Sequence, residues 1–263
     1  MRPLNENEFN KEKNIKFVLT DIDGTLTTNG RLPKEAYIAM ERLQNSGIKV
    51  IPITGRPAGW CDHMARMWPI DGIVGENGAF YFCYLKNKRK MVRQYWRSDK
   101  QRLKDRTALN RIKERILNHC KGAKVSADQA YREADLAIDF CEDVSPLPMS
   151  EVDKIVNIFE EMGAKAKISS IHVNGWFGEY DKLSMTRKFF LDIYQKDLDN
   201  LKNQIIFVGD SPNDAPMFGY FPNSIGVANV NEFIGNLFFE PTWVTKNEGG
   251  QGFAEIVDNL LKK

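Results

Sequence analysis

Two carboxylates directly follow a short apolar segment near the start of this chain. The segment begins at Phe17 and is typical of a buried β-strand, and Asp21 and Asp23 come where it ends. Because side chains alternate along an extended backbone, both carboxylates leave the chain on the same side. Two negative groups so close together need compensation, which a divalent cation bound by oxygen ligands supplies. Such a cation would also let an anionic phosphate approach a carboxylate nucleophile.

Two further apolar segments end on polar residues that could act with these carboxylates. One runs from Ile48 to Ile53 and stops at Thr54, and another runs from Gln204 to Gly209 and stops at Asp210. In an open parallel sheet the carboxyl ends of the strands border one crevice, where ligands bind. We therefore expect residues far apart in sequence to share a site. Thr54 alone would be explained equally well as a hydroxyl that ends a strand.

A lysine at the predicted start of a helix is a further candidate. Asp181 is a suitable N-cap, and Lys182 follows it. A helix N-terminus is electropositive, so a cation there is disfavoured unless something anionic offsets it. We interpret Lys182 as a phosphate-binding residue, against the alternative of a solvated surface lysine. Asn213 and Asp214 follow Asp210 closely, and we expect them to belong to the same site. The alternative for this pair is that they cap a helix after the preceding proline.

The order of predicted elements indicates an α/β fold with a Rossmann-like parallel sheet. Strands and helices alternate up to about residue 84 and again from residue 181. The segment between them has mixed strand and helix order, and we expect it to form an inserted α+β cap domain. The predicted organisation is a core of residues 1–84 and 181–263 with a cap of residues 85–180. Residues 1–14 are polar, and we expect them to fray.

Two strands, over 80–85 and 91–96, are predicted to be joined by a basic turn, and four further elements are predicted within the inserted segment. They are a charged helix over 100–120 with Leu103, Leu109, Ile112 and Ile116 on one side, a half-buried strand over 135–140, a helix over 150–163, and a strand over 166–173.

The motifs resemble those of the haloacid dehalogenase-like hydrolases. The first motif of that family is DxDGT, and Asp21-Ile-Asp-Gly-Thr25 fits it without a mismatch. Thr54, Lys182 and the segment Gly209–Asp214 resemble the second, third and fourth motifs, in the family's order. The position of the inserted segment, between Thr54 and Lys182, resembles the larger cap type of sugar-phosphate phosphatases related to sucrose-phosphatase and the Cof-like group.

The resemblance implies a role for each of these residues. Asp21 would be the nucleophile, forming an aspartyl-phosphate, and Asp23 the general acid and base. The cofactor would be Mg²⁺. Its implied ligands are the side chains of Asp21 and Asp210 and the backbone carbonyl of Asp23, with Asp214 in a supporting position. The implied phosphate-binding residues are Thr54, Gly55, Lys182 and Asn213.

Candidate substrate-contacting residues lie near these motifs and at the end of the inserted segment. They are Arg56, Asn77, His172, Asn174 and Trp176. A polar pair beside an aromatic ring suits a sugar. An alternative is that Asn174-Gly175 form a β-turn and that Trp176 packs on a hinge.

Composition excludes several other classes of protein. No apolar segment approaches the roughly 20 residues needed to cross a bilayer, and the N-terminus lacks a secretion signal, so we expect a cytoplasmic protein. The four cysteines form no CxxC pair, which favours reduced thiols over a zinc or redox site. Residues 86–115 contain 13 Lys or Arg against three acidic residues. Charge runs are usually solvated faces, so this stretch argues only weakly for nucleic acid.

The sequence thus predicts a Mg²⁺-dependent phosphatase acting on a phosphate monoester, a sugar phosphate or similar small phosphorylated metabolite. Two alternatives remain open: a phosphosugar mutase with the same nucleophile, and a non-catalytic sugar-phosphate sensor. These patterns determine neither the substrate nor the oligomeric state.

Overall fold

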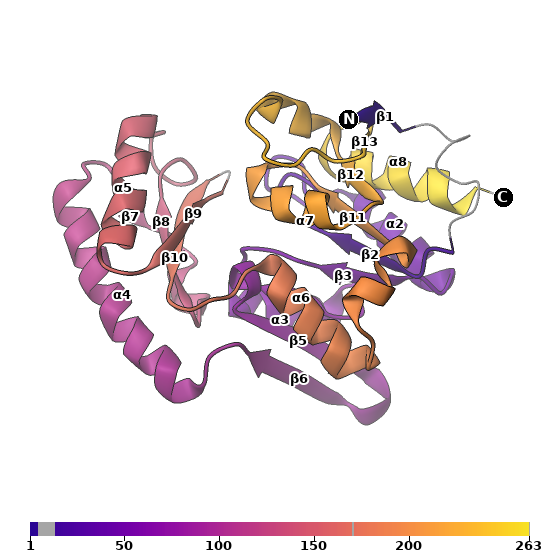
Figure 1. The fold of residues 1–263 in the computed structure, drawn as a ribbon, viewed down its shortest axis with the longest axis horizontal. Coiled ribbons are helices and arrows are strands. Elements are labelled where there is room, and N and C mark those ends of the chain that lie inside the picture. The colour runs from indigo at the N-terminus through magenta and orange to yellow at the C-terminus, as the bar shows by residue number, and fades with distance from the viewer. Residues whose placement is uncertain (5–13, 170, 263) are drawn as a thin grey trace.

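Parallel strands form the central sheet of the larger part of the molecule, in the order β1-β13-β12-β11-β2-β3 (Figure 1). The computed structural model describes residues 1–4, 14–169 and 171–262. The strands of this sheet are β1 (Arg2–Pro3), β2 (Phe17–Thr20), β3 (Lys49–Pro52), β11 (Ile205–Gly209), β12 (Ser224–Gly226) and β13 (Trp243–Val244). The predicted α/β class with a parallel core sheet is confirmed.

Helices cover both faces of this sheet, which explains why its strands read as continuous apolar runs. Along β2, Val18 packs into the cluster formed with α2, α3 and α8. Phe17 and Leu19 pack on the opposite face with α6 and α7. The helices are α2 (Lys34–Asn45), α3 (Ala58–Met67), α6 (Lys182–Phe189), α7 (Ala215–Tyr220) and α8 (Gly249–Leu261).

An antiparallel extension continues the sheet beyond β3. A parallel bridge between Ile53 and Val74 joins β3 to β4 (Ile73–Gly75), which pairs with β5 (Phe80–Leu85), and β5 pairs with β6 (Lys90–Tyr95). The boundary predicted between residues 84 and 85 therefore falls inside the β5–β6 hairpin. Because Phe80 and Phe82 of β5 lie in the same apolar cluster as β2, this hairpin is continuous with the core.

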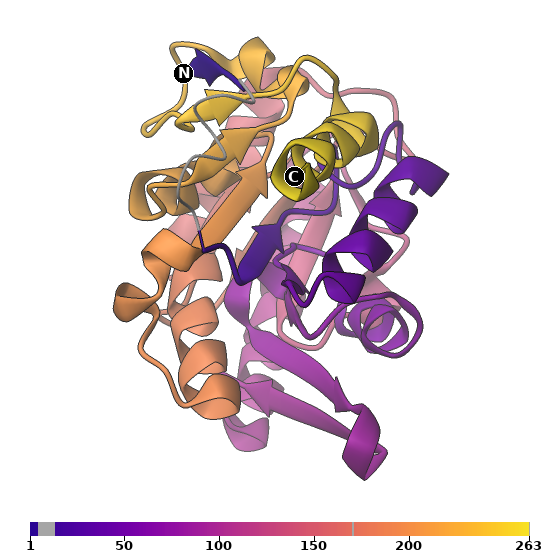
Figure 2. The ribbon, with the colours of Figure 1, turned by 90° about the vertical axis from the view of Figure 1, so that its right-hand side faces the viewer.

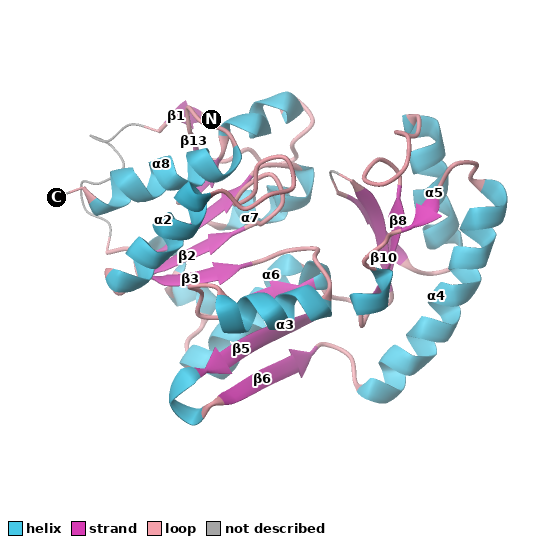
Figure 3. Cartoon of the chain, turned by 180° about the vertical axis from the view of Figure 1, so that it is seen from behind, coloured by secondary structure: helices cyan, strands magenta, loops and turns pink. Residues whose placement is uncertain are grey.

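Residues 99–176, here called the inserted module, form a separate antiparallel sheet in the order β7-β8-β10-β9. Both of its long helices lie on the side of this sheet away from the central sheet (Figures 1 and 3). Its elements are α4 (Asp99–His119), β7 (Lys124–Val125), β8 (Asp135–Asp139), α5 (Met149–Glu161), β9 (Lys165–Ile168) and β10 (His172–Trp176).

The module has an apolar core of its own, and two predictions about it were inaccurate. Leu109, Ile112 and Ile116 of α4 are buried in that core, whereas Leu103 is 67% exposed because it precedes the part of the helix that packs on the sheet. Strand β8 was predicted to be half-buried, but all five of its residues are buried. Its outer face is covered by the central part of the molecule.

The strand predicted over 166–173 is in fact two strands. Strands β9 and β10 form a hairpin, with the amide of Ser169 donating to the carbonyl of His172 at 2.8 Å. Asn174 and Gly175 lie inside β10, so the alternative of a β-turn there is wrong. The amide of His172, the first residue of β10, donates a hydrogen bond to the hydroxyl of Ser169.

The first residues of the chain are ordered, contrary to the prediction that residues 1–14 fray. Arg2 and Pro3 form β1 at the edge of the sheet beside β13, and Leu4 is buried (Figure 2). Residues 5–13 lie outside the described part of the chain. No helix among the described residues is both long and apolar enough to cross a membrane. Cys61, Cys83 and Cys120 are buried.

Substitutions in α4 test the packing of this helix in the apolar core of the inserted module. Ile112→Ala should lower the free energy of unfolding by about 2–5 kcal/mol, because Ile112 is fully buried in the module. Leu103→Ala is the matched control on the same helix and should change it by less than about 0.5 kcal/mol. Urea unfolding followed by circular dichroism measures both. Equal losses for the two variants would contradict the observed orientation of α4.

Candidate active site

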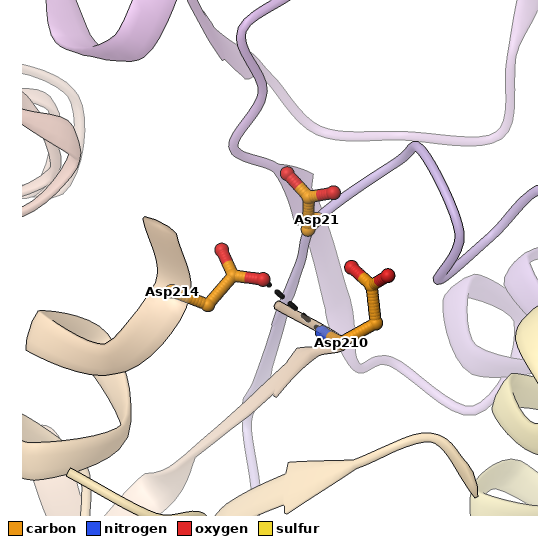
Figure 4. Close-up of side chains that lie close together, drawn as sticks. All are labelled: Asp21, Asp210 and Asp214. Atoms are coloured by element: carbon orange, nitrogen blue, oxygen red, sulfur yellow. Dashed lines mark hydrogen bonds between the residues drawn. The ribbon is translucent and has the colours of Figure 1, made fainter. Parts of the chain in front are cut away.

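Carboxylates from two neighbouring strands and one helix converge at the carboxyl edge of the central sheet (Figure 4). Asp21 follows β2, and Asp210 follows β11, its parallel neighbour. Asp214 lies one turn further along, where α7 begins. Oxygen atoms of the three side chains all lie within 4.8 Å of one another, and all three residues are buried. The structure therefore brings together the acidic residues that the sequence predicted to share a site.

Lys182 lies between two of these carboxylates. Its Nζ is 2.8 Å from Oδ1 of Asp21 and 2.8 Å from Oδ1 of Asp214, and the side chain is 6% exposed. Asp181 caps the helix as predicted, since its carboxylate accepts the amide of Ser184 at 2.7 Å. The capping carboxylate offsets the helix dipole and fixes where the helix starts, which in turn aims Lys182 at the acidic cluster.

Two glycines allow the carboxylates to approach the backbone this closely. Gly24 has a φ of +75°, and a Cβ there would lie 2.3 Å from Oδ2 of Asp210. A Cβ at Gly209 would lie 2.5 Å from Oδ2 of Asp214, which accepts the amide of Asp210 at 3.1 Å (dashed in Figure 4). Both contacts are too short for any side chain, so the positions require glycine.

Asp210 is held by side chains from opposite ends of the chain. The Thr25 hydroxyl donates to its Oδ1 at 3.2 Å, and Nδ2 of Asn229 donates to its Oδ2 at 2.9 Å. Nδ2 of Asn229 also donates to the carbonyl of Gly24 at 3.0 Å. These bonds orient one carboxylate toward Asp21 and leave its remaining lone pairs free for a ligand.

Burial and mutual repulsion shift the protonation of this cluster. Burial raises the pKa of Asp21 to about 7, with Lys182 opposing the shift and Asp214 adding to it. Burial and then Asp21 raise the pKa of Asp210 well above its ordinary value. The neighbouring carboxylates outweigh burial at Lys182, whose pKa is raised. The site thus holds more negative charge than one ammonium compensates.

The residues present fit a divalent cation. Buried carboxylate oxygens are the ligands that hard cations prefer, and the excess negative charge favours one. Asp21 and Asp210 match the predicted side-chain ligands. The third carboxylate of the cluster is Asp214 rather than Asp23, and Asp214 is already engaged by Lys182 and by the Asp210 amide.

Asp23 and Arg56 face each other at the mouth of the site. Nε and Nη2 of Arg56 donate to both carboxylate oxygens of Asp23 at 2.8–3.0 Å. The guanidinium also lies 3.8 Å from Asp128 and 3.6 Å from Glu142 of the inserted module, and stacks over Trp60. Arg56 is therefore an ion-pair partner of the predicted general acid and of the module together.

The predicted phosphate-binding residues lie around Asp21 at differing depths. Gly55 and Asn213 line a narrow cavity of about 30 Å³ together with Asp21 and Asp23. Asn213 accepts the hydroxyl of Ser211 at 2.9 Å. Thr54 is fully buried beneath the cavity, and its hydroxyl oxygen accepts the amide of Arg56 at 3.0 Å.

The module closes the cavity from the opposite side. His172 and Asn174 of β10 line it, as does Arg132. Nε2 of His172 is 2.8 Å from Glu142, and burial lowers the pKa of His172. Two other predicted substrate residues do not line the cavity, since Asn77 packs beside Gly55 and Trp176 is buried against Tyr180.

Sequence reasoning missed three residues that shape the site: Asn229, Arg132 and Ser211. Arg132 is paired with Asp128 and Asp135 and donates to the carbonyl of Gly55 at 3.1 Å. No motif marks it, because its partners come from a loop and from the other part of the molecule. Asn229 comes shortly after the end of β12, and its place near a strand end of the same sheet was the available signal.

Comparisons with known proteins agree with this geometry. The family model described as haloacid dehalogenase-like hydrolase matches residues 18–133. A Saccharolobus solfataricus protein named phosphoglycolate phosphatase 1 is 27% identical over 252 residues, covering 94% of this chain and 96% of its own.

Solved structures share the whole fold. A Thermoplasma acidophilum crystal structure has a TM-score of 0.71 at 19% identity, covering 94% of this chain and 99% of its own. The sucrose-phosphatase of Synechocystis sp. PCC6803, in complex with sucrose and phosphate, has a TM-score of 0.63 at 13% identity, covering 94% and 98%.

The chain is similar to the haloacid dehalogenase-like hydrolases over residues 18–133, and it is similar to proteins named as phosphatases over nearly its whole length. These similarities support a phosphomonoesterase built on a parallel α/β sheet.

The Lys182 ion pairs make stability depend on pH. Lys182→Met leaves Asp21 and Asp214 buried without a counter-charge and should cost about 3–5 kcal/mol of unfolding free energy at pH 8. A carboxyl whose pKa is raised by folding loses stability as pH rises through the range between its unfolded and folded values. The loss should therefore be smaller at pH 5, where Asp21 takes up a proton because burial raises its pKa to about 7.

Urea unfolding at the two pH values measures this difference. Lys188→Met is the control, because its pair with Asp192 is partly exposed and should contribute less than about 1 kcal/mol. A Lys182→Met loss that is the same at pH 5 and pH 8 would contradict the charge assignment.

Proposed function

We propose that this protein is a Mg²⁺-dependent phosphatase that hydrolyses a small phosphate monoester through an aspartyl-phosphate on Asp21. The observation that carries the proposal is the contact of Asp21 with Lys182 at 2.8 Å, within a buried cluster that also contains Asp210 and Asp214. Asp21 also lines the cavity, where the phosphorus of an ester would be attacked.

In the proposed reaction, each residue of the site has its own role. Asp21 attacks phosphorus, the ester bond breaks, and Asp23 gives a proton to the departing alcohol. Asp23 next removes a proton from the water that hydrolyses the aspartyl-phosphate. Its ion pair with Arg56 keeps the carboxylate at the mouth of the site. Lys182, Asn213 and the amide of Gly55 neutralise and orient the phosphoryl oxygens.

The cation would be held by Asp21 and Asp210, with the backbone carbonyl of Asp23 as a further ligand. When bound, Mg²⁺ neutralises charge on the phosphoryl group and on the carboxylates that surround it. Asp214 then fixes the position of Lys182 and of the Asp210 amide.

We propose that the inserted module acts as a cap. The cavity is narrow and residues of the module close one side of it, so the module would move away for a substrate to enter. Because β6 pairs with β5, the moving unit begins after Trp96 rather than at residue 85. The closed cap excludes water from the ester and supplies His172 and Asn174 to the leaving group.

The substrate is a phosphorylated metabolite of a few carbons. The Saccharolobus relative named for phosphoglycolate aligns over nearly the whole chain and supports this size class. The sugar phosphate that the sequence predicted is one member of this class of small phosphorylated substrates. A phosphosugar mutase would transfer the phosphoryl group instead of releasing it, and a sensor would do neither.

Replacement of the nucleophile tests the reaction. With Mg²⁺ and p-nitrophenyl phosphate, Asp21→Asn should reduce the rate of phosphate release by at least about 10³-fold, because an amide cannot form the covalent intermediate. Asp62→Asn on the exposed face of α3 is the control and should retain wild-type activity. Phosphate release that survives in Asp21→Asn would remove Asp21 as nucleophile.

Metal removal tests the cofactor. Phosphate release should stop in EDTA and return with added Mg²⁺. Asp210→Asn should raise the Mg²⁺ concentration for half-maximal activity by about 10-fold or more, since it replaces a ligand carboxylate. Full activity in EDTA, or an unchanged Mg²⁺ requirement in Asp210→Asn, would contradict the proposed site.

A further inference from the structure

Lys167 of β9 lies at the rim of the active site. It is directly opposite Asn174 in the β9–β10 ladder, and residues directly opposite in an antiparallel pair extend from the same face of the sheet. Asn174 lines the active-site cavity. Lys167 in turn lines an adjoining groove with Pro212 and Asn213 of the core, and Asn213 borders both spaces. The Lys167 side chain is thus carried by the module toward the catalytic residues.

Lys167 is a partly buried cation without a counter-ion. Among the residues that the structure describes, no carboxylate oxygen lies within 4.0 Å of its Nζ. Burial lowers the pKa of Lys167, and the positive charge of Lys182 lowers it further. A charged group removed from water without a partner is costly, so an anion beside Lys167 would stabilise its ammonium.

The other cations at the site are already neutralised by carboxylates. Lys182 lies between Asp21 and Asp214. The two arginines are equally occupied, Arg56 with Asp23 and Arg132 with Asp128 and Asp135. A ligand with a negative group beyond its phosphoryl group therefore finds one unoccupied cation at this rim within the described chain.

We propose that Lys167 is a specificity-determining residue that binds a carboxylate on the leaving group of the substrate. The inference rests on the proposed phosphatase function and narrows its substrate to phosphate esters of short hydroxy acids. The flexible stem of lysine lets the ammonium turn from the groove into the cavity as the module closes over the ester. A neutral alcohol of the same size would leave Lys167 unpaired and would bind less well.

Two substrates of matched size test the assignment. Phosphoglycolate carries a carboxylate where 2-hydroxyethyl phosphate carries a hydroxymethyl group. Lys167→Met should lower kcat/KM for phosphoglycolate by about 10- to 100-fold, mainly through KM, the range expected for losing a charged hydrogen bond. Activity on 2-hydroxyethyl phosphate should change by less than about 3-fold, and Lys167→Arg should keep most of the preference.

Lys165→Met is the matched control. Lys165 is on the same strand two residues earlier, but it is exposed and paired with Glu179, so both substrates should be unaffected. Equal losses on the two substrates in Lys167→Met would assign Lys167 to the phosphoryl group or to stability, and would overturn the proposal. Wild-type selectivity in Lys167→Met would overturn it as well.

Binding of unreactive analogues separates this inference from the proposed function. Calorimetry with 3-phosphonopropionate and 3-hydroxypropylphosphonate, in the presence of Mg²⁺, should show tighter binding of the carboxylate, and Lys167→Met should abolish the difference. If the wild type hydrolyses neither ester, the phosphatase proposal fails, yet this binding difference still decides the role of Lys167. Equal binding of the two analogues to the wild type would overturn the role.

Discussion

The ammonium group of Lys182 stabilises the cluster of carboxylates at the carboxyl edge of the central sheet. Nζ of Lys182 lies 2.8 Å from Asp21 and 2.8 Å from Asp214, in a place where water is excluded. Without it, carboxylates from neighbouring strand ends would repel each other at close range. One cation does not balance three carboxylates, and burial together with the neighbouring carboxylates raises the pKa values of Asp21 and Asp210. In the proposed function a divalent ion would supply the missing positive charge.

A second buried carboxylate connects the module to the core. Glu76 is fully buried and accepts the backbone amides of Ala58 in the core and of Glu133 and Ala134 in the module at 2.6–2.9 Å. Arg132, next in the chain, reaches the carbonyl of Gly55. These bonds join the module to the same turn that supplies the Gly55 amide. The proposed closure of the module would therefore act on the proposed phosphate position.

Local rules were enough to predict the core site. A strand that ends on Asp21 and an aspartate that caps a helix before Lys182 are each readable from neighbouring residues. The parallel sheet then brings them together, because its strand ends must share one edge. Glu76 and Arg132 left no such signal. Their contacts between the module and the core join residues more than 50 positions apart and involve backbone groups, which have no residue identity to read.

The basic stretch of residues 86–115 shows that net charge counted from the sequence is equally incomplete, because it ignores partners elsewhere in the chain. Counting residues 86–115 gives a strongly positive segment, but several of its arginines pair with carboxylates outside it. Arg93 pairs with Asp62, Arg106 with Glu133 and Arg115 with Glu161. The prediction of one strand where the structure has the β9–β10 hairpin was also wrong because it relied on the pattern of residue types. The hydroxyl of Ser169 forms hydrogen bonds with the backbone of His172, and apolar periodicity does not detect such bonds.

The central claim is that buried carboxylates with raised pKa values await a divalent cation. Titration calorimetry of Mg²⁺ at pH 7, in two buffers of different ionisation enthalpy, tests it most directly. The account predicts saturable binding that releases protons, because Asp21 and Asp210 must ionise to bind the ion, and weaker binding in Asp210→Asn. Binding without proton release, or equal affinity in wild type and Asp210→Asn, would contradict it.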